Sequence, residues 1–160
     1  MPLRRLVAAG VRHAEAFALV AAAHLLIETT GWDRARAASD RLLPRRGRDR
    51  APSLPEAHHA LAIAIEQSVL RTSRLIPGAR CAPRALAARH MLARRGIPSK
   101  LIVGLRLKPR PEGHAWLEIG TPPDLVRLFA RDPSTYTPLD ALTGKRPASP
   151  RSPTPTPSSA

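Results

Sequence analysis

The stretch from Gly78 to Ile119 constrains the fold of this chain more than any other part of the sequence. It contains the only cysteine, Cys81, at the start of a run with helical periodicity. Pro83 suits the first turn of that helix, and Gly96 suits the position just past its end. We therefore expect a helix over 82–95 that carries the cysteine at its N-terminus.

Two runs of alternating residues follow this helix and predict a β-hairpin. The first strand is expected over 100–107, the second over 114–119, and the turn between them over 108–113, which is rich in Pro and Gly. Since successive strand residues point to opposite faces, His114, Trp116 and Glu118 share one face.

Helical periodicity also predicts three helices before Gly78, over 3–29, 33–43 and 53–74. Asp33 is expected to cap the second, and Ser53 with Glu56 forms a capping-box pattern at the third. After the hairpin we expect a short helix over 125–130 and a last short strand or irregular segment within 131–142. The pattern predicts an α+β fold, a helical N-terminal half followed by a cysteine-bearing helix packed on a small antiparallel sheet.

The expected division of the 160 residues follows from these elements and from composition. It comprises an N-terminal helical region (1–52), a core domain (53–142), and a tail rich in Pro, Ser and Thr (143–160) that is disordered by composition.

The bulk composition narrows the function classes. A formal net charge of +14 is compatible with nucleic acid, an anionic membrane or an acidic partner, but aromatic residues make up only 3% and no nucleic-acid-binding motif occurs. One cysteine excludes an internal disulfide and a cysteine-based zinc site, and neither an HExxH pattern nor a phosphate-binding Gly loop is present. We expect no metal, no cofactor and no nucleic-acid partner.

The first predicted helix bears on localisation. Its longest run without a formal charge, 16–27, has 12 residues, which is too short to span a bilayer. No clean signal-peptide cleavage site follows it. We expect a cytoplasmic protein, with a weak peripheral membrane contact through this helix as an open alternative.

Cys81 and His114 together suggest nucleophilic catalysis. A helix N-terminus and the nearby Arg80 and Arg84 place positive charge beside the thiol, and a histidine on an adjacent strand can act as its base. The alternative is that Cys81 is a small buried hydrophobic residue and His114 a structural one. For the other five histidines a structural role is favoured.

Several short motifs recur in an order that resembles one family. They are Cys81-Ala-Pro-Arg84-Ala-Leu86-Ala, Arg94-Arg-Gly-Ile-Pro98, Leu101-Ile-Val-Gly104 and Gly113-His-Ala-Trp116-Leu-Glu118. Over about residues 55–130 the chain resembles the transglutaminase-like core of the lasso-peptide leader peptidases.

The resemblance implies a papain-like cysteine peptidase that removes the leader from a ribosomally made precursor peptide. Cys81 matches the nucleophile and His114 the general base, whereas Trp116 and Glu118 match flanking motif positions. The family carries an acidic residue on a strand that follows the histidine strand. Asp124 is the nearest candidate for it, and Asp132 is a weaker one. This sequence departs from the family here, because the segment between Gly120 and Asp124 is shortened.

The implied partners are the precursor peptide, a separate leader-recognition protein and a lasso cyclase. Two alternatives stay open beside the peptidase, a non-catalytic scaffold of the same fold and a transglutaminase-type acyl transferase. A nucleic-acid-binding protein ranks last.

Overall fold

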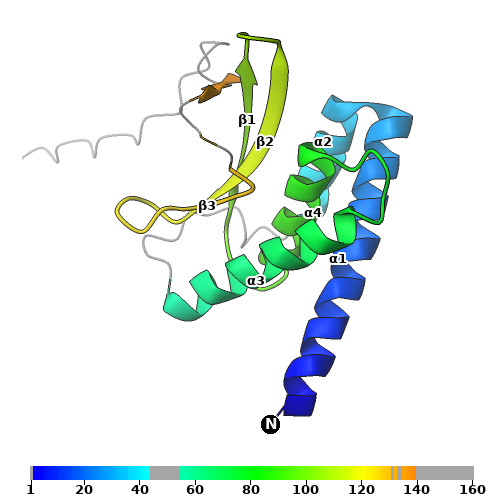
Figure 1. The fold of residues 1–160 in the computed structure, drawn as a ribbon, viewed down its shortest axis with the longest axis vertical. Helices are drawn as coiled ribbons and strands as arrows, with labels where there is room; N and C mark the ends of the chain where they lie inside the picture. The colour runs from blue at the N-terminus through cyan, green and yellow to red at the C-terminus, as the bar shows by residue number, and fades with distance from the viewer. Residues whose placement is uncertain (1, 44–54, 131, 133–134, 140–160) are drawn as a thin grey trace, which may run out of the picture.

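The computed structural model describes residues 2–43, 55–130, 132 and 135–139. Within these residues, four helices precede a four-stranded antiparallel sheet (Figure 1). This confirms the α+β fold. The helices are α1 (Pro2–Thr30), α2 (Trp32–Leu42), α3 (Glu56–Ser73) and α4 (Cys81–Ala93), and the strands are β1 (Lys100–Arg106), β2 (Glu112–Ile119), β3 (Val126–Leu128) and β4 (Thr137–Pro138).

The sheet has the strand order β3-β2-β1-β4. Strands β1 and β2 form the predicted hairpin, in a register that pairs Gly104 with His114. The expected helix over 125–130 is wrong, because β3 lies there and pairs Leu128 with Leu117 of β2. Pairing satisfies the backbone groups along the open edge of β2 and buries Leu128 completely, which outweighs the local helical signal.

Two predicted helix caps have different outcomes. The N-cap of α2 is Gly31, which has a φ of 81°. Asp33 lies inside the first turn, and no side chain forms a capping hydrogen bond there. The capping role predicted for Asp33 is therefore wrong. The N-cap of α3 is Pro55, while Ser53 lies outside the described residues. The expected tail over 143–160 also lies outside them.

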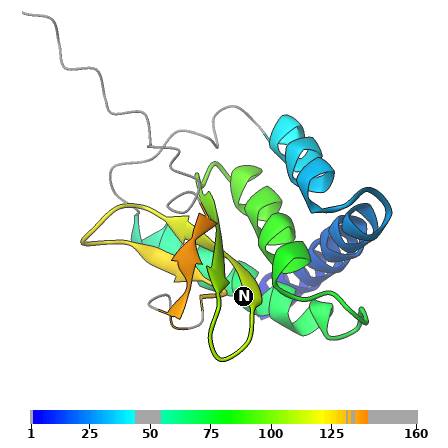
Figure 2. The same cartoon turned by 90° about the horizontal axis from the view of Figure 1, so that it is seen from above.

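Helix α4 lies at the centre of the molecule. Figure 2 shows it between the sheet on one side and α1 and α2 on the other. Its small residues Ala85 and Ala88 are fully buried, so neighbouring elements approach its backbone closely. One hydrophobic core joins Val20 of α1, Ile65 of α3 and Leu117 of β2 to this helix. The division at residue 52 stays a prediction, although helices from both sides of it share this core.

Helix α1 has an apolar composition, and it also forms ion pairs with residues at the end of α4. Its segment Leu6–Thr30 is long and apolar enough to cross a membrane, by length and composition alone. This segment is longer than the uncharged run 16–27, from which the sequence predicted that the helix is too short to span a bilayer. However, Val20 is fully buried in the core, and Glu15 pairs with Arg95 at 2.6 Å and with Arg94 at 3.2 Å. Part of the helix therefore packs against α3 and α4, although only 11% of its most apolar window is buried.

A polar contact ties α2 to α4. The Ser39 hydroxyl lies 2.9 Å from Nε2 of His90, and Arg89 forms an ion pair with Asp40 beside it. Burial lowers the pKa of His90 below its ordinary value of 6.5, and the positive charges of Arg89 and Arg94 lower it further, against the opposing effect of Asp40.

This lowered pKa predicts a pH-dependent stability. The unfolded chain binds the His90 proton more readily than the folded one, so the contribution of neutral His90 is present above about pH 6.5 and is lost as the pH falls below it. Urea unfolding between pH 5 and 8 should show a fall in the free energy of unfolding, with a slope of at most about 1.4 kcal/mol per pH unit from this group. His90→Gln should flatten that part of the profile, whereas His59→Gln, on the exposed face of α3, should leave it unchanged. Equal slopes in the parent and His90→Gln would contradict the prediction.

The sheet face opposite α4 carries a second apolar cluster. It comprises Ile102, Trp116 and Tyr136, and Gly104 of β1 lies against it. A Cβ atom at Gly104 would lie 2.9 Å from two ring carbons of Trp116 and 3.0 Å from Cβ of Tyr136. Glycine is therefore required here for close approach, and not for an unusual φ.

Gly104→Ala is expected to destabilise the protein by about 1–3 kcal/mol, the usual range for overpacking a filled core. The measurement is urea unfolding at neutral pH. The matched control is Gly10→Ala in α1, where an added Cβ meets nothing within 4 Å and the better helix former should stabilise by about 0.5–1 kcal/mol. Unchanged stability of Gly104→Ala would show that the Trp116 and Tyr136 side chains move aside at no cost.

Candidate active site

A cleft of about 410 Å³ opens where the start of α4 meets the start of β2. Cys81 and His114, which are 33 residues apart in the sequence, both line it. The remaining lining residues come from α3, the start of α4, the start of β2 and the segment after β3: Leu70, Arg80, Arg84, Glu112, Gly113 and Phe129. The structure thus places the two residues that the sequence pairs as nucleophile and base on the lining of the same cleft.

Cys81 is the first residue of α4 and is partly exposed. The first-turn N–H groups of a helix have no intrahelical acceptor, and here no side chain caps them and no acidic residue lies in the turn. Sγ lies 3.9 Å from the carbonyl oxygen of Gly113, the residue before His114. An accessible thiol in this position differs from the fully buried, purely structural cysteine that the sequence left open.

His114 lies on β2 and is buried, with only 8% of the residue exposed. Its ring stacks on Trp116, at 6.0 Å between ring centroids, and contacts Tyr136 at 5.1 Å. The contact agrees with the alternation in the sequence, which places His114 and Trp116 on the same strand face. The aromatic pair restricts the orientation of the imidazole.

The hydrogen bond of His114 assigns its tautomer. Nε2 lies 2.8 Å from the carbonyl oxygen of Phe129, and a carbonyl oxygen can only accept, so the proton of the neutral ring is on Nε2. Nδ1 then carries the lone pair. Of the two ring nitrogens, Nδ1 is therefore the one that can accept a proton from a thiol and later donate it to a leaving group.

The structure does not bring Asp124 to this pair. Asp124 is exposed in the turn between β2 and β3, beyond Ile119, and the strand from His114 to Ile119 alone spans about 17 Å. Asp132 is exposed as well, and its own carbonyl accepts from the Thr135 N–H at 3.2 Å. The acceptor on Nε2 of His114 is instead the backbone of Phe129.

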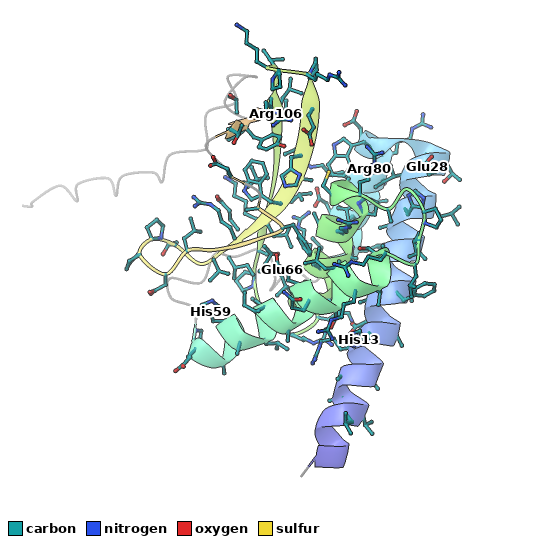
Figure 3. The ribbon with its side chains drawn as sticks, viewed as in Figure 1. His13, Glu28, His59, Glu66, Arg80 and Arg106 are labelled. Carbon is teal, nitrogen blue, oxygen red and sulfur yellow. The ribbon has the colours of Figure 1, made fainter. Side chains whose placement is uncertain are left out.

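Sequence reasoning missed Phe129 and the residue that contacts it, Glu66 of α3. The Phe129 N–H donates to Oε1 of Glu66, and Figure 3 shows Glu66 on the side of α3 that faces the β3 segment. A backbone carbonyl leaves no signature in a sequence. Glu66 is a charged residue next to the buried apolar positions of α3, such as Ile65 and Val69. From the sequence, a charged residue in a helix is normally expected at the solvated surface.

Charge on the cleft is mostly positive. Arg80 and Arg84 flank Cys81, while the acidic Glu112 is engaged by Arg106 across the hairpin. Guanidinium groups at this place can contact carbonyl or carboxylate oxygens of a bound peptide. Within the described ranges, no group of three or more His, Cys, Asp or Glu residues lies close enough to hold a metal ion.

Comparison with known proteins identifies a family for this chain. A family model described as the transglutaminase-like superfamily matches residues 11–139, a range that includes Cys81, His114, most of α1 and every later element to β4. Neither the curated proteins nor the solved structures give a significant match. Members of the superfamily are generally cysteine hydrolases or transferases. With most of its length matched, this chain belongs to the transglutaminase-like superfamily.

Proposed function

We propose that this protein is a cysteine endopeptidase that removes the leader peptide from a ribosomally synthesised lasso-peptide precursor. The observation that supports catalysis most directly is the shared cleft of Cys81 and His114, in which the Phe129 carbonyl leaves Nδ1 of His114 as the proton acceptor. The ordered motifs from Cys81 to Glu118 support the choice of substrate class, because they resemble those of the lasso-peptide leader peptidases.

The proposed reaction has two halves. In the first, Nδ1 of His114 takes the thiol proton, Cys81 sulfur bonds to the scissile carbonyl carbon, and the C–N bond breaks as the imidazolium protonates the leaving amine. In the second, a water molecule gives a proton to His114 and adds to the thioester carbon. The C–S bond then breaks and the thiol is restored. Backbone N–H groups at the start of α4 are positioned to stabilise the negative oxygen in both halves.

The proposal includes a cytoplasmic location and three partners, namely the precursor, a separate leader-recognition protein and a lasso cyclase. Exposed apolar side chains near the N-terminal end of α1 support a docking role for this helix, because Leu6, Val7 and Val11 are each more than half exposed. Figure 1 shows this end of α1 extending beyond the other helices. A peripheral membrane contact is the alternative use of the same side chains.

One specific observation favours a second candidate, the non-catalytic scaffold. The acid expected at Asp124 lies away from His114, and a chain that has lost a catalytic acid can keep its fold for binding alone. This candidate predicts that the protein binds the precursor complex without cleaving it.

The test is a reconstituted reaction of the purified protein with the precursor and the recognition protein, analysed by mass spectrometry. In ¹⁸O-labelled water, a peptidase releases a leader whose new C-terminal carboxylate carries the label. An acyl transferase instead joins the leader to an added amine and leaves the label out. Binding of the precursor without either product would support the scaffold and contradict the peptidase.

A further inference from the structure

We propose that Glu66 is a positioning residue of the active site, which acts through one peptide group. Its carboxylate fixes the backbone of Phe129, and the carbonyl of Phe129 in turn orients His114. The inference rests on the proposed function for its catalytic consequence, but the geometry that it predicts does not require a substrate.

Two hydrogen bonds on one residue carry the proposal. The Phe129 N–H donates to Oε1 of Glu66, 63 residues earlier on α3, and the Phe129 carbonyl accepts from Nε2 of His114 on β2 at 2.8 Å. A helix and a strand that are remote in sequence thus meet at the two polar groups of Phe129. The resulting chain runs from Glu66 through Phe129 to His114, whose Nδ1 is the proposed base for Cys81.

The backbone of Phe129 needs such an anchor. Its φ is 60°, in the left-handed region that residues with a side chain seldom adopt. The unusual conformation immediately follows Leu128, the last residue of β3, and takes the chain out of the ladder with β2. Strained backbone of this kind persists where its surroundings hold it, and it clusters at functional sites. Here the Glu66 carboxylate holds the N–H, and the Phe129 side chain packs against the core.

The carboxylate also has an electrostatic effect on the imidazole. Negative charge at the N–H of Phe129 polarises the peptide group and strengthens the carbonyl oxygen as an acceptor. His114 is buried and its ring contacts Trp116 and Tyr136, so this bond decides which ring nitrogen carries the proton. A peptide group inserted between acid and histidine thus replaces the direct carboxylate contact expected of Asp124.

The competing explanation is that the hydrogen bond between Glu66 and Phe129 only holds the segment after β3 against α3 and has no effect on His114. Glu118 offers a matched control, since its carboxylate contacts Arg127 of β3 at 3.1 Å and has no bond to Phe129 or His114 among the described contacts. If Glu66 only anchors the segment, Glu66→Ala and Glu118→Ala should have similar effects on the site.

The first measurement uses the unmodified protein and long-range ¹H–¹⁵N NMR of its histidine rings at neutral pH. His114 is expected to be the Nε2–H tautomer. In Glu66→Ala a fraction of Nδ1–H tautomer should appear, whereas Glu66→Gln, which keeps an oxygen acceptor, and Glu118→Ala should both match the parent. An Nδ1–H tautomer in the parent would overturn the inference, and so would an unchanged His114 spectrum in a folded Glu66→Ala protein.

The second measurement is the kinetics of leader release by the same variants. Glu66→Ala should lower kcat by about 10- to 100-fold with little change in KM, and Glu66→Gln should recover most of the rate. A tautomer shift without any leader release, in the parent or in a variant, would overturn the proposed peptidase and leave the role of Glu66 standing. Leader release unaffected by Glu66→Ala would overturn the role of Glu66 and leave the peptidase standing.

Discussion

Cys81→Ala is expected to reduce leader release to the rate seen without enzyme, a loss of about 10³-fold or more in kcat. The reason is that no other thiol exists in the chain, so no covalent thioester can form and the remaining groups can only bind the substrate. The measurement is single-turnover cleavage of the precursor in the presence of the recognition protein, with the leader quantified by mass spectrometry.

The structure offers clean controls for this experiment. Cys81 is partly exposed at the first position of α4, next to the fully buried Ala85, so replacement by Ala should leave the fold intact, as circular dichroism can verify. Cys81→Ser keeps the shape but offers a weak nucleophile, and it should be nearly as inactive. Parent-like cleavage by Cys81→Ala would mean that the thiol is not the nucleophile.

His114→Gln is expected to lower kcat/KM by about 10²- to 10⁴-fold, the usual contribution of a positioned general acid and base. An amide at this position can still meet the Phe129 carbonyl, but it cannot take the thiol proton or return it to the leaving amine. The same variant should slow alkylation of Cys81 by iodoacetamide near neutral pH, because the thiolate loses its partner.

Two features separate this effect from a general loss of stability. His59→Gln, on the exposed face of α3, changes the same residue type away from the cleft and should behave like the parent. Alkylation needs no precursor, so it reports on the pair of Cys81 and His114 even if the peptidase assignment fails. A His114→Gln protein with parent kcat/KM and parent alkylation rate would remove His114 from the mechanism.

Local sequence signals were sufficient for the elements that carry the two central residues. The Pro and Gly positions around α4 gave its ends to within two residues, and alternation gave the hairpin. Alternation also placed His114 and Trp116 on one sheet face, where their rings stack. These features depend on contacts between near neighbours in the chain, which is why a single sequence reveals them.

Features that depend on remote contacts were not predictable in the same way. The residues 121–124 can cap a short helix over 125–130, but pairing with the edge of β2 and burial of Leu128 make β3 the favoured structure. The family resemblance makes Asp124 the nearest acidic candidate along the sequence, yet its distance from His114 depends on where the β2–β3 turn projects. The bonds that Glu66 and His114 make to Phe129 involve main-chain groups, which every residue type possesses.

The sequence by itself determined the α+β class, the helix that begins at Cys81 and the strand face of His114, because periodicity and helix-ending residues act over a few positions. Tertiary structure alone decided that these two residues share one cleft and that a main-chain carbonyl contacts the histidine. The physical reason is that the cleft forms only when α4 packs on the sheet, and that the left-handed backbone at Phe129 is held by a carboxylate 63 residues away.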